Sequence, residues 1–398
     1  MRLLKIIIQN MPRFKGDIDI DFITKQRVAE DDKEKLFNVF SNNKTSIYTN
    51  QAISFIGLNA SGKTTILKVI SFVINLLNNE ALNNIESKEI LNDLAENEKV
   101  KIISIFYNDN CIYKLETVIE KRINKVDNEE KFIIAEERLW EKDTNKVKTK
   151  KSLFDFNDSE IRIERDEKEQ FLLNDVSVMI AINKEKQSNF PLRDMLMWTN
   201  HNMLNVIGKF PKELLTFLDP SIEYFKCNLK KKPADIRLKF YASEEIILNR
   251  PSDIEKYLSS GTIKGISVFM NALLCFIEGG YLIVDELENH FNEEIATTLV
   301  RFFMNPNVNK NGATLIYSTH YSELLDEYER NDCIYIVRNR DGIYAENLSL
   351  ILKRNDIKKS EAYESGFLEG TVPVYEAYMA LKKVLSSARI EEDEEDNG

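Results

Sequence analysis

The segment 57-GLNASGKT-64 constrains the fold more than any other part of this chain. It fits the pattern G-x-x-x-x-G-K-[ST] at every fixed position, and it lies between an apolar run, 52–56, and a stretch with helical apolar periodicity, 66–77. A strand, a glycine-containing loop and a helix form the setting in which this pattern binds phosphate, because backbone N–H groups turn toward phosphate oxygens at a helix N-terminus. The sequence therefore predicts an α/β fold built around a phosphate-binding loop.

The residues of this loop have distinct expected roles. Lys63 is expected to reach the β- and γ-phosphates of a nucleotide, and the hydroxyl of Thr64 is expected to ligate Mg²⁺. Further phosphate contacts are expected from five neighbours: Asn59, Ala60, Ser61, Gly62 and Thr65. A glycine turn followed by a solvated lysine is the alternative, and the flanking strand and helix disfavour it.

Two adjacent acids follow a second apolar run in the segment 281-YLIVDE-286. A buried strand at this place would deliver Asp285 and Glu286 at the C-terminal edge of a sheet. Asp285 is then expected to hold Mg²⁺ together with Thr64. Glu286 is expected to orient and deprotonate the attacking water, because hydrolysis at such sites depends on positioning and charge stabilisation. Taken alone, the pattern also fits a strand that ends in a solvated acidic loop.

A third apolar run, 313-ATLIYSTH-320, ends at a histidine. A histidine at a strand end is most often structural, but its place after the phosphate loop and the acidic pair favours a contact with the γ-phosphate. We therefore expect His320 to act as a catalytic residue beside Glu286 and Lys63.

The segment 258-LSSG-261 opens a strongly apolar stretch that continues to residue 277. Ser259, Ser260 and the backbone of Gly261 are expected to stand at a helix N-terminus, which favours anions. The chain already has a phosphate loop, so the expected ligand of this second N-terminus is the γ-phosphate of ATP held by another protomer. An ordinary serine N-cap on a core helix is the alternative.

In this order the four segments resemble the motifs of an ATP-binding-cassette (ABC)-type ATPase. The opening residues 1–22 and the segment 285-DELENHF-291 resemble the RecF, SMC and OLD branch of that superfamily more than its transporters. The layout is similar to stand-alone AbiL-like ATPases, many of which are encoded beside an effector in bacterial anti-phage systems. The resemblance covers residues 1–350. It implies a P-loop NTPase fold of ABC type, ATP and Mg²⁺ as cofactors, and a homodimer closed around ATP or a higher homo-oligomer.

Several positions depart from the pattern of that superfamily. Thr262 stands where a signature glutamine is usual, and only Gln187 and Asn183 are candidates for the glutamine-loop residue that senses Mg²⁺. The stretch 65–257 has no sustained heptad repeat, which argues against SMC-like coiled-coil arms. The residues after His320 lack the carboxylate cluster of an appended nuclease. We therefore expect the effector, a nuclease or a toxin, to be a separate protein.

The remaining sequence predicts an accessory sheet and a helical lobe. β-rich alternation with Asn-Asp turns at 101–122, 131–142 and 160–166 indicates an antiparallel accessory sheet. Residues 333–348 indicate a hairpin. In chain order we expect the first part of the ATPase core with that sheet, a helical insertion, the second part of the core, and C-terminal helices with an acidic tail, at 1–183, 184–240, 241–350 and 351–398.

Charge and composition narrow the function. The net charge of −11 argues against a broadly basic surface, although a local DNA groove stays open, with 146–151 and 226–232 as basic candidates. No secretion signal and no stretch of 18 apolar residues is recognised, so a cytoplasmic protein outside the membrane is expected. The preferred function is a regulatory ATPase of an anti-phage defence system, resembling toxin–antitoxin pairs, that controls a separate effector. A RecF-like DNA repair or recombination ATPase is the alternative, and a transport ATPase is least favoured.

Overall fold

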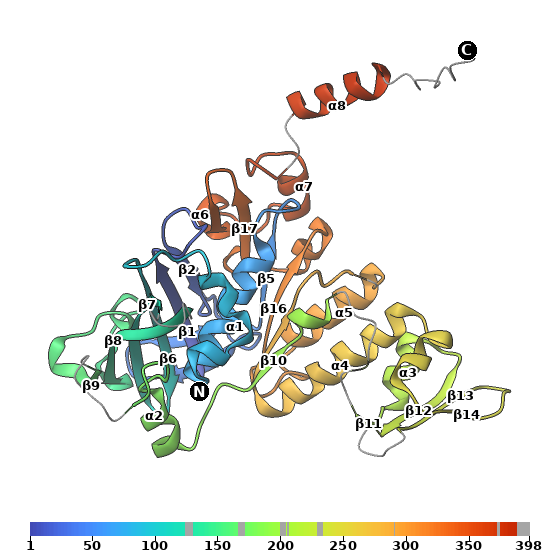
Figure 1. Cartoon of the computed structure of the whole chain (residues 1–398), viewed down its shortest axis with the longest axis horizontal. Helices are drawn as coiled ribbons and strands as arrows, with labels where there is room; N and C mark the ends of the chain where they lie inside the picture. The colour runs from blue at the N-terminus through green and yellow to red at the C-terminus, as the bar shows by residue number, and fades with distance from the viewer. Residues whose placement is uncertain are drawn as a thin grey trace, which may run out of the picture.

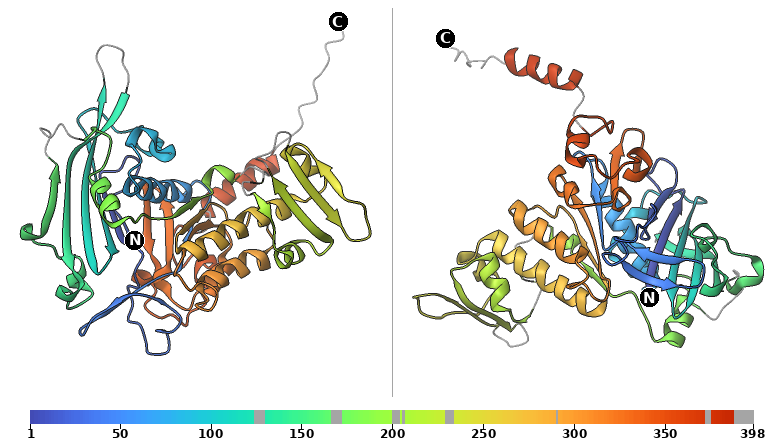
Figure 2. Two further views of the ribbon diagram at one scale, coloured as in Figure 1. Left: turned by 90° about the horizontal axis from the view of Figure 1, so that it is seen from below. Right: turned by 180° about the vertical axis from the view of Figure 1, so that it is seen from behind.

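The computed structural model describes residues 1–123, 130–165, 172–199, 204, 207–228, 234–289, 291–371 and 375–387. A central α/β core carries a large antiparallel sheet on one side and a small second sheet on the other (Figure 1). The C-terminal helices extend from the core between these two lobes, and the two further views in Figure 2 show the same three-part arrangement.

The core is a six-stranded sheet in the order β10-β15-β16-β5-β17-β18. The first five strands are parallel, and only the edge strand β18 runs antiparallel to its neighbour. In sheet order the bounds are Leu192–Asp194, Tyr281–Val284, Thr314–Thr319, Ala52–Ile56, Ile334–Asn339 and Ile343–Asn347. Because β16 lies between β5 and β15, the carboxyl ends of all three strands meet at one edge.

Helices cover both faces of this sheet, as the fully buried strand sequences require. Ile53 and Phe55 of β5 face α1 (Lys63–Leu77), whereas Ala52 and Ile56 belong to the apolar cluster on the other face. That second cluster includes α4 (Ser260–Glu278) and α5 (Glu293–Met304). The alternation of strand side chains between two helical layers confirms the predicted α/β architecture.

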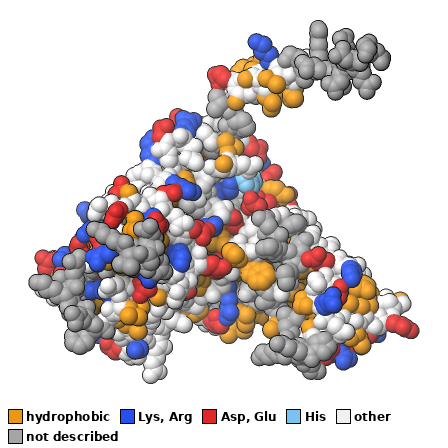
Figure 3. All heavy atoms as spheres, in the orientation of Figure 1, with side chains coloured by type: hydrophobic (Ala, Val, Ile, Leu, Met, Phe, Trp, Pro, Cys, Tyr) orange, Lys and Arg blue, Asp and Glu red, His pale blue; other side chains and the backbone are white. Residues whose placement is uncertain are grey.

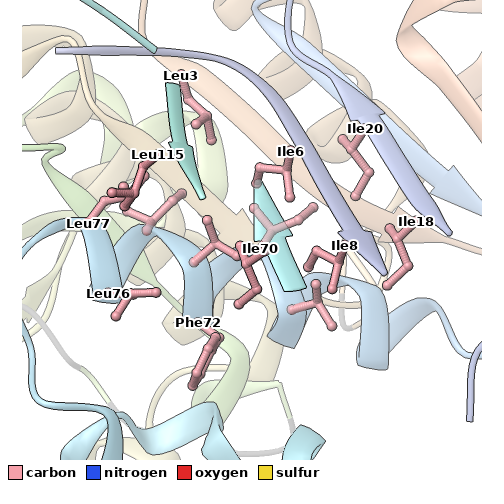
Figure 4. Close-up of a cluster of buried hydrophobic side chains, with 14 of the residues drawn as sticks. Leu3, Ile6, Ile8, Ile18, Ile20, Ile70, Phe72, Leu76, Leu77 and Leu115 are labelled. Atoms are coloured by element: carbon pink, nitrogen blue, oxygen red, sulfur yellow. The ribbon is translucent and has the colours of Figure 1, made fainter. Parts of the chain in front are cut away.

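The accessory sheet is antiparallel throughout, in the order β2-β1-β6-β7-β8-β9, which confirms its prediction. Its strands, in chain order, span Arg2–Gln9, Ile18–Asp21, Lys99–Asn108, Cys111–Ile123, Glu130–Asp143 and Ile161–Arg165. Figure 4 shows Leu3, Ile6 and Ile8 of β1 among the buried side chains that this sheet shares with Ile70 and Leu77 of α1. The helix that starts at the phosphate loop is therefore held between the two sheets.

The prediction of a helical lobe over 184–240 is wrong for most of its described residues. Three strands of this range, β11 (Gly208–Lys209), β12 (Ile222–Asn228) and β13 (Asp235–Phe240), form a four-stranded sheet with β14 (Ile246–Leu248), which follows the range. The short helix α3 (Lys212–Leu218) packs against β12. Buried side chains alternate along β13, where Ile236 and Leu238 pack inward, so period 2 governs this segment. The predicted boundary at 184 also cuts off β10, which belongs to the core sheet.

The remaining elements are short. A hairpin of β3 (Phe37–Ser41) and β4 (Ser46–Thr49) precedes β5, and α2 (Met179–Lys186) follows the accessory sheet. The predicted hairpin at 333–348 is confirmed as β17 and β18. The C-terminal helices are α6 (Leu348–Ile351), α7 (Lys359–Glu364) and α8 (Tyr375–Ser387), and the predicted acidic tail lies outside the described residues.

Among the described helices, α4 alone is long and apolar enough to cross a membrane, and 61% of its apolar stretch is buried inside the protein. It contacts β15, β10 and α3. The apolar character of this helix is therefore accounted for by its place in the core.

Candidate nucleotide site

The phosphate loop and the three side chains expected to bind or hydrolyse ATP within one chain meet at one edge of the core sheet. The loop 57–62 follows β5, Asp285 and Glu286 follow β15, and His320 follows β16. The loop, Glu286 and His320 line a cavity of about 770 Å³, a volume in the range typical of small-molecule sites, and Asp285 contacts the lining residue Thr64. The described residues that line it are Arg13, Asn59, Ala60, Ser61, Gly62, Lys63, Thr64, Thr65, Glu286, His320, Asn339, Gly342 and Ile343.

The two fixed glycines of the loop are required by close contacts. Gly62 has φ of +97°, and a Cβ atom there would lie 2.6 Å from the side chain of Ile343. At Gly57 a Cβ atom would lie 2.2 Å from the carbonyl oxygen of Val337. Glycine is favoured at position 62 by the left-handed backbone and at position 57 by the close carbonyl oxygen. The strand β17 and the hairpin that follows it therefore fix the shape of the phosphate loop.

Lys63 folds back over the loop. Its Nζ donates to the carbonyl oxygens of Gly57 and Leu58 at 2.9 and 3.1 Å, and lies 3.5 Å from Nδ1 of His320. Burial lowers the pKa of the Lys63 ammonium, and the charges of Asp285 and nearby glutamates oppose that shift. The ammonium is thus positioned at the loop, with main-chain acceptors that phosphate oxygens can replace.

Thr64 and Asp285, the two expected metal ligands, are in contact. The Thr64 hydroxyl donates to Oδ2 of Asp285 at 2.8 Å. A hydroxyl and one carboxylate beside a phosphate loop suit Mg²⁺, which binds few protein groups and keeps water and phosphate oxygens as its other ligands. The described residues contain no cluster of three or more His, Cys, Asp or Glu side chains that could hold a metal by themselves. This pair therefore fits a metal that arrives with a nucleotide.

Ser318 supports both acids, and motif reasoning missed it. The fully buried hydroxyl donates to Oδ1 of Asp285 at 2.5 Å and accepts the N–H of Glu286 at 2.8 Å. The Ser318 carbonyl also accepts the N–H of Leu287 at 3.0 Å. The sequence signal that could have identified Ser318 is a hydroxyl residue two positions before His320, on the strand next to the one that ends at the acidic pair. Ser318 connects β16 to the acidic turn.

Glu286 and His320 face each other across the cavity. Oε1 of Glu286 lies 4.0 Å from Nε2 of His320, and the Glu286 side chain is 41% exposed. Glu286 has φ of +47°, an uncommon conformation for this residue type, which turns the chain sharply after Asp285. A solvent-accessible carboxylate beside the phosphate loop is suited to accept a proton from water.

The signature residues lie apart from this cavity. Ser259 caps α4: its Oγ accepts the N–H of Thr262 at 3.1 Å and lies 2.8 Å from the Thr262 hydroxyl. Ser259 is exposed, Ser260 and Gly261 are half-buried, and none of the three is among the described residues that line the cavity. The predicted helix start is observed, and Thr262 serves the cap at the position where a glutamine is usual.

Neither candidate for the glutamine-loop residue lies at the site. Asn183 donates to the Leu77 carbonyl at the far end of α1, and Gln187 is an exposed residue that ends α2. Asn183 lies within α2, which is not part of the core sheet. The strand beside β15 is β10, which ends at Asp194, and the Ser71 hydroxyl donates to that carboxylate.

Two distant segments complete the cavity. Arg13, in the turn after β1, lines it and pairs with Asp93. Asn339, at the end of β17, donates to the carbonyl of Ala60 at 3.2 Å. No local pattern marks these residues as nucleotide contacts, because the tertiary fold alone brings them to the loop.

The comparisons with known proteins agree with this geometry. A family model described as "AAA domain, putative AbiEii toxin, Type IV TA system" matches residues 53–326. The match includes the phosphate loop, the signature segment, the acidic pair and His320. No curated protein matches the sequence. Because the family model covers more than half of the chain, the protein belongs to this family of AAA/ABC-like P-loop ATPases.

Proposed function

We propose that the protein binds and hydrolyses ATP as an ABC-type ATPase of the RecF, SMC and OLD branch, and that it dimerises around the nucleotide. The observation that carries the proposal is the division of the site. The phosphate loop, Thr64, Glu286 and His320 line one cavity, and Asp285 is hydrogen-bonded to Thr64, whereas Ser259 is exposed at a separate helix N-terminus. A second protomer would supply the missing half.

Within one protomer each side chain has a distinct task. Lys63 and the loop N–H groups bind the β- and γ-phosphates, and Thr64 with Asp285 holds the metal. When bound, Mg²⁺ neutralises charge that builds up on the phosphates. Glu286 accepts the proton of the attacking water, and Ser318 keeps the two acids in register. His320, whose Nδ1 lies 3.5 Å from Nζ of Lys63, donates a hydrogen bond to the γ-phosphate.

The dimer would act as a switch with its output in another protein. Ser259 and Gly261 of the partner would bind the γ-phosphate, so hydrolysis would remove the charged contact and release the protomers. The family description names a toxin and a type IV toxin–antitoxin system, which supports a regulatory role in bacterial defence with a separate nuclease or toxin as effector.

The alternative of DNA binding has less support. The basic segment 146–151 follows β8, the segment 226–232 begins within β12, and these two strands lie at opposite ends of the molecule (Figure 1). Lys146 pairs with Glu160, and Lys150 donates to the Thr24 carbonyl, while part of 226–232 lies outside the described residues. On the face drawn in Figure 3, basic and acidic side chains are interspersed. Stimulation of hydrolysis by duplex DNA would instead favour the alternative.

A mixing experiment tests the shared site. Lys63→Ala removes phosphate binding, and Ser259→Arg blocks the signature, so each variant alone is expected to be inactive. In an equal mixture, half of the dimers contain one intact composite site, so hydrolysis should rise clearly above that of either variant, to at most about a quarter of the wild-type rate. A mixture as inactive as its components, or full activity of Ser259→Arg alone, would contradict the proposal.

A further inference from the structure

Glu288 is a buried carboxylate beside the site whose hydrogen bonds are only half satisfied. It is 9% exposed, and its Oε1 accepts the main-chain N–H of His320 at 2.6 Å. Its Oε2 has no hydrogen-bond partner among the described residues. Glu288 does not line the nucleotide cavity, and its hydrogen bond to the site goes to the main chain of His320.

Lys264 is a buried cation in the same neighbourhood and is also poorly paired. It is 4% exposed and lies in the second turn of α4, five residues after Ser259. Its Nζ donates to the Thr199 carbonyl at a long 3.4 Å, and Asn289 donates to the same oxygen at 3.4 Å. Burial lowers the pKa of Lys264, and the charges of Glu286 and Glu288 oppose this shift, so both carboxylates lie within its electrostatic reach.

Glu288 has an oxygen without a hydrogen-bond partner among the described residues, whereas Lys264 has a long contact to a neutral carbonyl and lies 5.9 Å from the centre of the Phe291 ring. These two buried charges of opposite sign favour a second arrangement in which they pair. A buried charge without a close partner is costly, and a direct pair with good geometry offsets most of that cost. The Thr199 carbonyl is a weak competitor, because it is neutral and shared. A small shift of α4 would exchange this contact for the free oxygen of Glu288.

The helix α4 connects such a shift to the signature. Ser259 caps its first turn, and the Ile263 N–H donates to the Ser259 carbonyl at 3.0 Å, so the turn that precedes Lys264 is regular. On the side of the nucleotide cavity, Glu288 accepts the main-chain N–H of His320, and Nδ1 of His320 lies 3.5 Å from Nζ of Lys63. The exposed signature residues lie at the start of α4, and Glu288 contacts the main chain beside the phosphate loop, so a Lys264–Glu288 contact would connect the two.

We propose that Lys264 and Glu288 are positioning residues that couple the signature loop of a protomer to His320 of that same protomer. When Ser259 and Gly261 engage the partner's ATP, α4 shifts, Lys264 pairs with Glu288, and the carboxylate fixes His320 for its own γ-phosphate. Each composite site thereby reports its occupancy to the other. This inference rests on the proposed nucleotide-bridged dimer.

Steady-state hydrolysis of Lys264→Met, Glu288→Gln and the double variant tests the coupling. Each single variant should lower kcat about tenfold and leave KM for ATP within about twofold, because the phosphate loop is untouched. The double variant should be no slower than either single variant, and Lys264→Arg should restore part of the rate. Lys359→Met is the matched control, since Lys359 is also 4% exposed but lies in α7, and its kcat should be unchanged.

Hydrogen exchange provides a second readout that a purely structural role would not change. The His320 amide is the N–H that Glu288 accepts. In wild type, ATP should slow hydrogen exchange of this amide, whereas in Lys264→Met ATP should still bind but should no longer slow the exchange. Wild-type kcat in both single variants, additive losses in the double variant, or equal protection of the amide in Lys264→Met would each overturn the inference. In the Lys63→Ala and Ser259→Arg mixture the intact site belongs to the protomer with the blocked signature, so this coupling lowers the expected recovery about tenfold, to about a fortieth of the wild-type rate. Recovery to a full quarter would contradict the coupling, whereas no recovery at all would instead overturn the dimer on which the inference rests.

Discussion

Replacing Ser318 by alanine should weaken both the fold and the metal site. The hydroxyl makes two hydrogen bonds, to the charged Oδ1 of Asp285 at 2.5 Å and from the N–H of Glu286 at 2.8 Å. A bond to a charged group contributes about 1.5–3 kcal/mol and a neutral one about 1 kcal/mol. Ser318 is fully buried, so water cannot simply replace the hydroxyl. We expect a loss of about 2–4 kcal/mol in the free energy of unfolding.

Urea unfolding without nucleotide measures this loss as a shift of the midpoint at constant slope. Ser267→Ala is the matched control, because Ser267 is 2% exposed and its hydroxyl has no hydrogen-bond partner among the described residues. Its unfolding free energy should change by less than about 1 kcal/mol. Equal midpoints for the two variants would refute the role of Ser318.

The same variant should also lose metal-dependent nucleotide affinity. Without the hydroxyl, Asp285 keeps only the contact from Thr64 and can turn away from the metal. Calorimetric titration with ATP should therefore show a larger loss of affinity with Mg²⁺ than with EDTA. Equal losses under both conditions would mean that Ser318 affects the phosphate loop instead of the metal pair.

Three further perturbations test separate parts of the account. Gly62→Ala should weaken ATP binding at least tenfold, because φ at Gly62 is +97° and an added Cβ atom would lie 2.6 Å from the side chain of Ile343. Gly16→Ala is the control: φ at Gly16 is also positive, at +79°, but no atom lies within 4 Å of an added Cβ, so this variant should bind ATP normally in the same titration. Deletion of the chain after Thr371 should change the melting temperature by less than about 2 °C, since the side chains described in α8 are exposed, and a larger fall in calorimetry would reveal a packed helix. Burial raises the pKa of Asp194 in the folded protein above its ordinary value of 3.8, so the free energy of unfolding of wild type should fall as the pH rises through this interval, whereas Asp194→Asn should lack this fall. A difference in urea midpoints between the two proteins that does not change with pH would contradict this.

The sequence predicted the parts of the site that lie at the ends of core elements. Lys63, Asp285 and His320 each follow a strong apolar run that can form little else than a buried strand, so their meeting at one sheet edge could be inferred. The accessory sheet was predictable from period-2 alternation for the same reason.

The parts that were missed depend on tertiary contacts. Ser318 is one of many serines until β16 is placed beside β15, and Arg13 reaches the cavity only through the fold of the accessory sheet. The lobe after β10 gives only a weak strand signal, because its strands are short and contain charged residues, as at 235–240.

The most direct test is the mass of Glu286→Gln in solution. This variant should bind ATP through the intact phosphate loop and fail to hydrolyse it, because the amide cannot accept the proton from water. Light scattering should then give twice the chain mass with ATP and Mg²⁺, and a single chain with ADP or with Ser259→Arg added to the variant. A single chain that binds ATP tightly and stays monomeric would contradict the shared nucleotide site.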